Sequence, residues 1–474
     1  MSDQLYILAV LVAYKVLLLG VGVWAQRRVK TTEDLFLGGR GLGGFVAALS
    51  YSASSSSAWK LLGFSGLVFV VGFSAIWLMF GSILGAFIAW YWLAPRLYQA
   101  SKANQSLTLT EFLCAGLDEG SRRPLVIVAS IIVLISFTLY VAAQFQGAGN
   151  MFSATFDLSL NKSIVLGALI IFIYTVLGGF WAVSVTDAIQ GLVMAFATLI
   201  LPIAAVLALG GPVSFIQTLA LVATPEQLSL TGGNLGLVAL GVIVGNMSVS
   251  ASTLGQPHML VRFMALKDES AIRTGRRCAI AWYLITDIGV VIVGLAGLAL
   301  QTQVGNPENL FFTLTGELFH PLIAGVITAA ILSAIMSTAD SQLLVSASAI
   351  SHDLNMQKRF ASSPLAVSRL CILFVVVFSV VVTLLLPEAI FSRALFAWVA
   401  LGASFGPLII VNLCNRAISA DVRLLAMLTG FSLAITFYLL PNSPGDILER
   451  ALPFTVALAI AWFGSKRKVI PEAQ

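Results

Sequence analysis

Residues 50–57 read Ser-Tyr-Ser-Ala-Ser-Ser-Ser-Ser, and Ala58-Trp59-Lys60 follow them. This polar run lies inside an apolar stretch, at residues 43–70, that is long enough to cross a membrane. Serine side chains compete with the hydrogen bonds of a helix, so the run predicts a broken membrane helix. A second run, at residues 245–257, reads Gly-Asn-Met-Ser-Val-Ser-Ala-Ser-Thr-Leu-Gly-Gln-Pro. Its glycines and proline predict a second break.

The two breaks carry a functional interpretation. Unwound backbone deep in a membrane is tolerated only where protein or a water-filled cavity surrounds it. Two interrupted spans in corresponding positions are typical of transporters built from inverted repeats, with the binding site between the repeats. The alternative is that the serines only let helices pack closely, as small residues do in membranes.

Composition supports a membrane protein. The chain is 59% hydrophobic and 10% charged, against roughly 25% charged residues in typical soluble proteins, so much of its surface must face lipid. The four cysteines, Cys114, Cys278, Cys371 and Cys414, predict buried thiols rather than a disulfide framework. The apolar stretch that starts at Tyr6 has no small-residue cleavage site behind it, which predicts a retained span and not a signal peptide.

Apolar stretches of sufficient length predict an all-α membrane protein with about thirteen spans in a single domain, residues 1–474. The expected spans lie near residues 5–25, 43–70, 74–98, 124–152, 163–180, 189–209, 236–258, 277–302, 321–350, 367–386, 388–414, 421–440 and 449–465.

Basic residues predict the orientation. With the N-terminus outside, the inner loops hold Arg27, Arg28, Lys30, Arg40, Lys102, Arg122, Arg123, Arg262, Lys267, Arg273, Arg276, Arg277, Lys358, Arg359 and the tail Lys466-Arg467-Lys468. The outer loops then hold only Lys162, Arg393 and Arg450. The positive-inside rule therefore predicts a multi-pass plasma-membrane protein with its C-terminus in the cytoplasm. The net charge of +5 sits in these short loops and does not indicate a nucleic-acid partner.

At its motifs the chain resembles the sodium/solute symporter family, and within it the bacterial sodium/proline symporter branch. The resemblance runs from about residue 5 to about residue 440 and rests on Leu37-Gly38-Gly39-Arg40, Leu62-Gly63, Gly178-Gly179-Phe180, Ser184, Thr186-Asp187, Gly255-Gln256-Pro257-His258, Arg262-Phe263-Met264-Ala265, Met336-Ser337-Thr338 and Gln342-Leu343-Leu344. It implies a LeuT-like fold of five-plus-five inverted repeats, here about 43–209 and 236–414, with peripheral helices at 5–25, 421–440 and 449–465. It also implies alternating access in the bacterial cytoplasmic membrane, driven by a cation gradient.

The resemblance implies a sodium site made of oxygen ligands. Carried over, the ligands are the backbone oxygens of Ala53, Ser56 and Ala334 and the side chains of Ser337 and Thr338. A hard cation binds such oxygens, and unwound backbone can supply them. The alternative is that both hydroxyls bond back to their own helix.

Two further acids are candidates for cation coupling. The family uses the carboxylate at Asp187 in cation handling, although an aspartate there also suits the N-cap of the sixth span. Asp340, two residues after Thr338, is expected either to add charge to the main site or to face the inner vestibule. Arg40 is expected to gate or to anchor the inner end of the second span.

The chain departs from its relatives beside the first break. Proline symporters have an aspartate where this chain has Ser55, and an apolar residue where it has Lys60. A lysine inside a membrane is costly enough to suggest a function. It is expected to replace sodium and couple transport to protons, to pair with a substrate carboxylate, or to be neutralised by Asp287 in the eighth span.

For the solute, Trp59 and Tyr140 match aromatic positions around the ligand of proline symporters. Such walls suit a small amphipathic molecule, such as an amino acid or a carboxylate. Further candidates are Gln144, Ser250 and Thr253. The branch's seventh-span aromatics are replaced by Val249 and Thr253, which argues against proline in the same pocket. His258 is expected to cap or pack, and His320 is a weaker candidate still.

Other functions are disfavoured. The sequence has no HExxH, GxSxG, Walker or cysteine–histidine motif, so we expect no enzyme and no enzyme-type cofactor. A transporter-like sensor is the alternative, although only about ten residues follow the last expected span, too few for a signalling domain. A channel is disfavoured because broken helices around an aromatic pocket suit occlusion.

Overall fold

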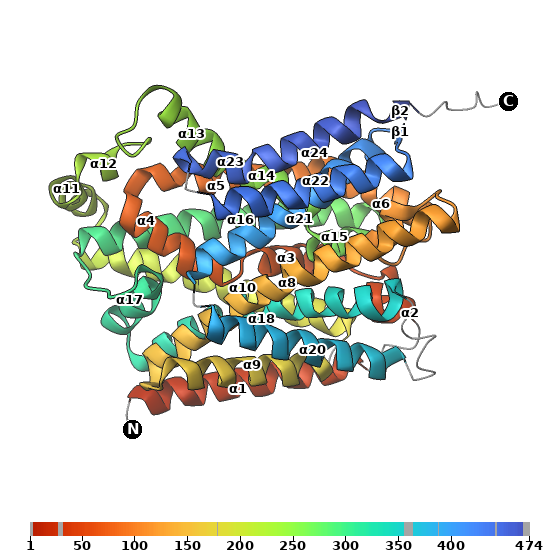
Figure 1. The fold of residues 1–474 in the computed structure, drawn as a ribbon. Helices are drawn as coiled ribbons and strands as arrows, with labels where there is room; N and C mark the ends of the chain where they lie inside the picture. The colour runs from red at the N-terminus through yellow and green to blue at the C-terminus, as the bar shows by residue number, and fades with distance from the viewer. Residues whose placement is uncertain are drawn as a thin grey trace.

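The computed structural model describes residues 3–26, 32–177, 179–354, 364–386, 388–440 and 443–467. The described chain is almost entirely helical (Figure 1), as predicted. Predictions that fall on Arg27, Arg28, Lys30, Gly178, Lys358, Arg359 and Lys468 lie outside the described residues.

The N-terminal half contains the first break. Its elements are α1 (Asp3–Gln26), α2 (Thr32–Leu37), η1 (Gly38–Arg40), α3 (Gly44–Ser55), η2 (Trp59–Phe64), α4 (Ser65–Val71), η3 (Gly72–Ala75), α5 (Ile76–Ile88), η4 (Ala89–Leu93), α6 (Ala94–Ala103), α7 (Leu109–Cys114), α8 (Glu119–Phe156), α9 (Leu160–Leu177), α10 (Phe180–Ala208), α11 (Pro212–Val222) and α12 (Pro225–Leu228). The second expected span is thus split between α3 and the pair η2–α4.

The C-terminal half contains the second break. Its elements are α13 (Gly236–Met247), α14 (Val249–Ser252), η5 (Thr253–Gly255), α15 (Pro257–Met264), α16 (Glu269–Ala299), η6 (Pro307–Asn309), α17 (Leu310–Leu318), α18 (Pro321–Ser348), η7 (Ala349–Asp353), α20 (Pro364–Leu385), α21 (Ile390–Leu413), β1 (Arg416–Ala417), α22 (Ala420–Leu439), η8 (Pro444–Asp446), α23 (Ile447–Arg450), α24 (Leu452–Phe463) and β2 (Lys466–Arg467). The seventh expected span is divided into α13, α14, η5 and α15.

The described helices can be compared with the thirteen expected spans. Ten helical segments of the described chain are long and apolar enough to cross a membrane, and Leu160–Val176 is a shorter apolar helix. The last expected span corresponds to α24, whose 12 residues extend about 18 Å, well short of a hydrocarbon core of about 30 Å. A multi-pass membrane protein is confirmed, and the count of thirteen stays a prediction.

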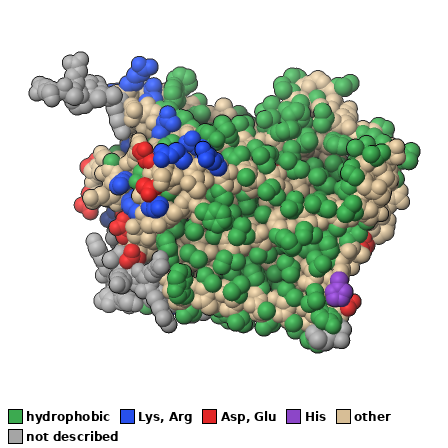
Figure 2. Space-filling view, turned by 180° about the vertical axis from the view of Figure 1, so that it is seen from behind, with side chains coloured by type: hydrophobic (Ala, Val, Ile, Leu, Met, Phe, Trp, Pro, Cys, Tyr) green, Lys and Arg blue, Asp and Glu red, His purple; other side chains and the backbone are tan. Residues whose placement is uncertain are grey.

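The surface agrees with a membrane environment. Hydrophobic side chains cover the middle of the face seen in Figure 2, while Lys and Arg side chains gather towards one end. Large apolar residues that a soluble protein would bury are exposed, including Val16 on α1, Phe196 on α10 and Phe374 on α20. These helices present an apolar belt to lipid.

Two of the motifs, the one that ends at Arg40 and the one that ends at Ala265, meet at one end of the broken helices. Leu42 exchanges backbone hydrogen bonds with the segment after α15, donating to Ala265 O at 3.0 Å and accepting from Lys267 N at 3.1 Å. The Arg40 guanidinium donates to Met264 O at 3.0 Å and to Ser106 O at 2.8 Å. Arg40 therefore joins the ends of the second and seventh spans to the loop before α7, which agrees with an anchoring role.

Candidate functional site

The break in the second span is held open by a side chain from another helix. Helix α3 ends at Ser55, Ser56 has φ −103° and ψ 66°, and the chain resumes as the π-helical turn η2. Gln144 of α8 accepts a hydrogen bond from Ala58 N at 3.1 Å. The carboxamide thus satisfies a backbone donor that the broken helix leaves unpaired. Gln144 supports the break itself, beyond its predicted role towards the solute.

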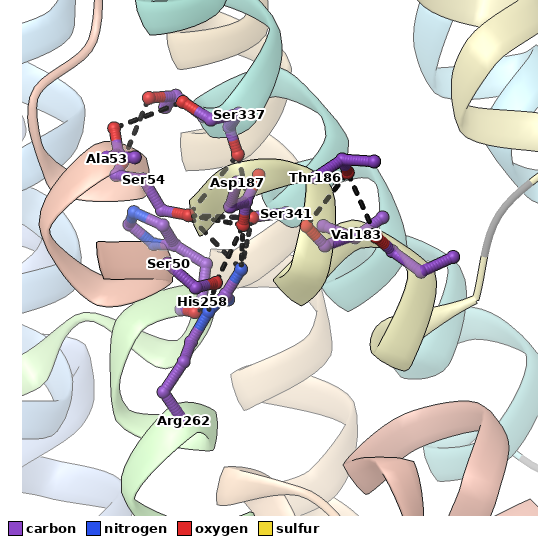
Figure 3. A network of polar contacts seen from close by, with 12 residues as sticks. Ser50, Ala53, Ser54, Val183, Thr186, Asp187, His258, Arg262, Ser337 and Ser341 are labelled. Atoms are coloured by element: carbon purple, nitrogen blue, oxygen red, sulfur yellow. Dashed lines mark hydrogen bonds and ion pairs between the residues drawn. The ribbon is translucent and has the colours of Figure 1, made fainter. Parts of the chain in front are cut away.

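The predicted sodium ligands lie together beside this break. Ser337 Oγ on α18 donates to Ala53 O at 3.1 Å and more weakly to Ala334 O at 3.4 Å (Figure 3). Thr338 Oγ1 donates to Ser54 O at 2.9 Å. The hydroxyls therefore reach across to α3 instead of bonding only within α18. Neutral carbonyl and hydroxyl oxygens of this kind suit a hard monovalent cation.

Ser56, one of the predicted ligands, lies just after the end of α3. Its backbone N–H donates to Ser52 O and Ala53 O at 3.1 and 3.2 Å. All five predicted ligands are buried. They stay a predicted site, with Ser54 as an oxygen that sequence reasoning did not name.

Asp187 is bound to Arg262, a residue of the Arg262-Phe263-Met264-Ala265 motif for which the sequence predicted no partner. Arg262 Nη2 of α15 lies 3.0 Å from Asp187 Oδ2, and both side chains are buried. Ser50 and Ser54 also donate to that oxygen, at 2.7 and 3.3 Å, while Arg262 donates to Ser341 at 2.5 Å. Figure 3 shows the guanidinium pointing into this network from below α3. Asp187 therefore joins α10 to both broken spans.

The described contacts of Asp340 do not include the predicted cation ligands. Asp340 accepts a hydrogen bond from Thr175 of α9, and Met336, one turn earlier on α18, contacts Lys15 of α1. The Asp340 side chain is completely buried. A contribution of Asp340 to the main cation site stays a prediction, and no local pattern predicts its contact with α9.

Lys60 pairs with Asp287, as the third of the three expected roles of this lysine requires. Lys60 Nζ lies 2.9 Å from Asp287 Oδ1, with both side chains buried. Ser82 of α5 bridges them, 3.2 Å from each. The ammonium also lies 4.4 Å from the centre of the Tyr283 ring. In place of the relatives' aspartate, Ser55 Oγ lies 2.5 Å from the Tyr283 hydroxyl.

Four rings from four helices pack against one another between the two breaks. Trp59 and Tyr140 lie with their ring centres 6.5 and 6.4 Å from Trp398 of α21. His258 of α15 completes the group, 6.3 Å from both Tyr140 and Trp398. We call Trp59, Tyr140, His258 and Trp398 the aromatic cage. Sequence reasoning missed Trp398, because no local pattern predicts a contact between segments so far apart in the chain.

Ser250 and Thr253 lie on a different side of the seventh span. A Cβ atom built on Gly85 of α5 would come within 2.8 Å of Thr253 Oγ1 and 3.0 Å of Ser250 Cα. Thr253 Oγ1 donates back to Val249 O at 3.1 Å. Both residues therefore pack on α5, and a role in binding the solute stays a prediction for them.

Cavities of unequal size approach the cage from opposite ends. A cavity of about 540 Å³ near η6 ends at Phe391, whose ring centre is 6.2 Å from that of Trp59. The cavity near α7 that reaches Arg262 and Ser341 measures only about 40 Å³. A space of that size holds a few waters and no organic solute. This conformation is therefore closed at the α7 end.

The α7 end is fastened by polar contacts. His352 Nε2 lies 3.0 Å from Glu111 Oε1, and Arg122 lies 3.7 Å from the same oxygen. Burial acts to raise the pKa of the Glu111 carboxyl, but hydrogen bonds from His352 and from Leu107 N, together with the charges of His352 and Arg122, hold that pKa below its ordinary value. The ionised carboxylate therefore links α7 to η7 and α8.

Comparison with known proteins decides the family. A profile described as the sodium:solute symporter family matches residues 35–430. The chain belongs to this family. The osmoregulated proline transporter of Bacillus subtilis (strain 168) is 35% identical over 426 residues, which cover 88% of this chain and 85% of the relative. Sodium/proline symporter 2 of Staphylococcus saprophyticus is 34% identical over 444 residues, covering 90% and 85%.

Solved structures confirm the LeuT-like fold of this symporter. A Na⁺-coupled sialic acid symporter in a substrate-bound, outward-open state aligns with a TM-score of 0.79 at 19% identity, over 98% of this chain and 99% of that one. MhsT in complex with L-phenylalanine aligns with a TM-score of 0.56 at 16% identity, over 89% and 98%. The chain is a secondary transporter of a small solute, and not an enzyme.

Proposed function

We propose that this symporter carries a small amino acid of about the size of proline together with sodium. The aromatic cage between the two breaks carries the proposal, because it offers flat apolar walls with polar edges next to the oxygen group on α3 and α18. Aromatic rings with polar edges suit a small amphipathic solute. The names of the relatives, which transport proline, support the same class of solute.

Sodium is the proposed coupling ion because the ligands at the first break are neutral oxygens. An unpaired ammonium about 5 Å from a bound sodium would repel it by roughly 3 kcal/mol at an effective dielectric of about 20. The Lys60 ammonium is paired with Asp287, whose carboxylate offsets that repulsion. The oxygen group of Ala53, Ser56, Ala334, Ser337 and Thr338 is therefore proposed to hold sodium as a co-substrate.

Proton coupling is the second candidate. A buried lysine–aspartate pair such as Lys60–Asp287 is a recognised place for proton exchange in membrane transporters. In this alternative the ammonium of Lys60 takes over the role of sodium. A sensor that uses the transporter fold without coupled transport is a third possibility that the same experiment addresses.

The proposal includes the arrangement in the membrane. The chain is proposed to act as a single transport domain, residues 1–474, whose inverted repeats cover about 43–209 and 236–414. Helices α1, α22 and α24 are proposed to be peripheral. The gathering of basic side chains at one end supports a cytoplasmic position for that end, with the N-terminus outside.

Transport by the purified protein in proteoliposomes tests the proposal. L-proline uptake is measured with an inward sodium gradient, with an inward proton gradient, and with neither. We expect uptake with sodium only, and the double variant Ser337→Ala/Thr338→Ala should need at least tenfold more sodium for half-maximal uptake. Ser346→Ala is the matched control, because Ser346 is buried in the same helix and has no hydrogen-bond partner within the described chain. Uptake that follows protons and ignores sodium overturns the sodium assignment.

A further inference from the structure

Helix α16 begins with three arginines that have no acidic partner. Arg273 and Arg277 are exposed and Arg276 is half-buried, and none of the three forms an ion pair within the described part of the chain. At spacings of three and four residues they lie on one face of the helix. The acid one turn earlier on α16, Glu269, instead accepts a hydrogen bond from Gln99 of α6 at 3.2 Å.

Arg276 lies against an aromatic ring of the neighbouring segment. Its guanidinium carbon is 4.1 Å from the centre of the Tyr91 ring in η4, within the range of a cation–π contact. The Tyr91 ring stacks on Phe87 of α5, with the ring centres 4.3 Å apart. A Cβ atom on Gly275 would lie 2.4 Å from the Trp90 ring, so η4 and α16 are in close contact. We call the line of contact between α5–η4 and α16 the seam.

Both helices of the seam expose apolar side chains beyond the arginines. Phe80, Leu84 and Phe87 follow one another on one face of α5, and Leu284 and Ile288 do so on α16. These five side chains are 39–47% exposed. From the arginines to Ile288 helix α16 rises about 18 Å, slightly more than half of a hydrocarbon core of about 30 Å. The two apolar rows therefore have the length of one leaflet's acyl chains.

We infer that the seam binds an anionic phospholipid, with its phosphate on Arg273, Arg276 and Arg277 and its acyl chains along the two apolar rows. Charge complementarity favours this occupant, because a zwitterionic headgroup carries its own cation and gains less from three unpaired arginines. Lys and Arg side chains gather at this end of the molecule (Figure 2). In the proposed orientation the lipid belongs to the cytoplasmic leaflet.

A lipid on the seam also bears on the ion pair after the first break. Ser82 of α5 donates to Asp287 of α16 at 3.2 Å, and both side chains contact Lys60. A lipid that contacts both helices holds them together on the outside of this group. Because a ligand that binds only the folded state stabilises it, the anionic lipid should raise the melting temperature of the protein.

Titration of dioleoyl phosphatidylglycerol into the purified full-length protein in neutral detergent tests the inference, with thermal unfolding as the readout. The lipid should raise the melting temperature of the wild type, and dioleoyl phosphatidylcholine should not. In Arg273→Gln/Arg276→Gln/Arg277→Gln, half-maximal stabilisation should need at least tenfold more phosphatidylglycerol. The control Arg123→Gln/Lys466→Gln/Arg467→Gln removes the same charge from exposed positions of α8 and β2 and should change this concentration less than twofold. Equal responses of the two triple variants, or of the wild type to the two lipids, overturn the inference.

A second pair of measurements decides the question if the seam triple variant does not fold. Arg273→Gln/Arg277→Gln changes only exposed side chains, and it should still raise the half-maximal lipid concentration at least threefold. Dihexanoyl phosphatidylglycerol has the same headgroup on short chains, so it should stabilise the wild type much less than the dioleoyl lipid. A double variant that responds like the wild type, or a short-chain lipid that stabilises as well as the long-chain one, overturns the inference. None of these readouts depends on the solute or on the coupling ion.

Discussion

The two broken spans occupy corresponding places in the fold, yet different forces stabilise them. The first break is polar, with Gln144 bound to Ala58 N and hydroxyls of α18 bound to the last carbonyls of α3. The second break is closed by backbone packing. A Cβ atom on Gly255 would lie 2.6 Å from Gly406 N and 2.7 Å from Gly402 O, and Gln256 donates to Trp398 O at 2.8 Å.

The two breaks therefore correspond to each other in the symmetry of the fold, but they differ in the chemistry that each offers to a ligand. The first break presents oxygens to neighbouring helices, and a buried ion pair at Lys60 and Asp287 follows it within one turn. The second break presents glycine to α21 and supplies His258 and Arg262 only beyond it, on α15. Ligand-binding oxygens are therefore expected at the first break, and close helix contact at the second. Four comparisons between variants test this division.

The largest effect is expected when the ion pair after the first break loses its cation. Lys60→Met leaves the Asp287 carboxylate buried without a counter-charge, with Ser82 as its remaining hydrogen-bond donor, which costs about 3–5 kcal/mol. We expect a strongly lowered melting temperature in detergent, or no folded protein. Lys60→Met/Asp287→Leu, which replaces both charges by apolar groups, should regain most of that stability.

The double variant Lys60→Met/Asp287→Leu also distinguishes sodium-coupled transport from proton-coupled transport. If sodium drives transport, the folded double variant should keep sodium-dependent uptake. If Lys60 carries protons, uptake driven by a proton gradient should vanish in it. A single variant Lys60→Met that is as stable as the double would contradict the assignment of this pair.

The next effect concerns the glycine packing at the second break. Gly255→Ala forces a methyl group against the backbone of Gly402 and Gly406, and overpacking of this kind costs about 1–3 kcal/mol. Gly316→Ala in α17 is the control, since a Cβ atom there meets nothing within 4 Å in the described chain, and alanine favours a helix by up to about 1 kcal/mol. Thermal unfolding should move in opposite directions for the two variants. Equal shifts would indicate that the contact with α21 is unimportant.

A smaller effect is expected on solute binding. Trp59→Ala removes one wall of the aromatic cage and should weaken solute affinity at least tenfold, about 1.4 kcal/mol. Thr253→Val keeps the shape of a side chain that packs on α5 and should change affinity less than twofold. Competition against labelled L-proline measures both. A larger loss of solute affinity for Thr253→Val than for Trp59→Ala would indicate that the solute binds at the second break.

Local residue patterns were enough to predict the fold. They did not predict contacts between residues that are far apart in the sequence. The serine run and the Gly-Gln-Pro motif indicate the breaks because serine, glycine and proline disturb any membrane helix. The partner of Lys60 was one of three possibilities, since sequence alone does not reveal which helix lies opposite. The contact of Trp398 with Trp59 and the pairing of Arg262 with Asp187 join segments far apart in the sequence, so no local pattern predicts them.

The smallest effect compares one serine at each break. Ser55 Oγ at the first break donates to Ser52 O at 2.8 Å and lies 2.5 Å from the Tyr283 hydroxyl, whereas Ser252 Oγ at the second is buried without a hydrogen-bond partner among the described residues. A typical hydrogen bond contributes about 0.5–1.5 kcal/mol, while an unpaired buried hydroxyl contributes nothing that alanine would lose. Ser55→Ala should therefore lower the free energy of unfolding by about 1 kcal/mol, and Ser252→Ala should leave it unchanged or raise it slightly. Chemical denaturation of the purified protein in detergent measures the pair under identical conditions. Equal losses for the two serines would mean that a serine hydroxyl stabilises the second break as much as the first, in addition to the hydrogen bond from Gln256 to Trp398 O, and the contrast between the two breaks would then fail.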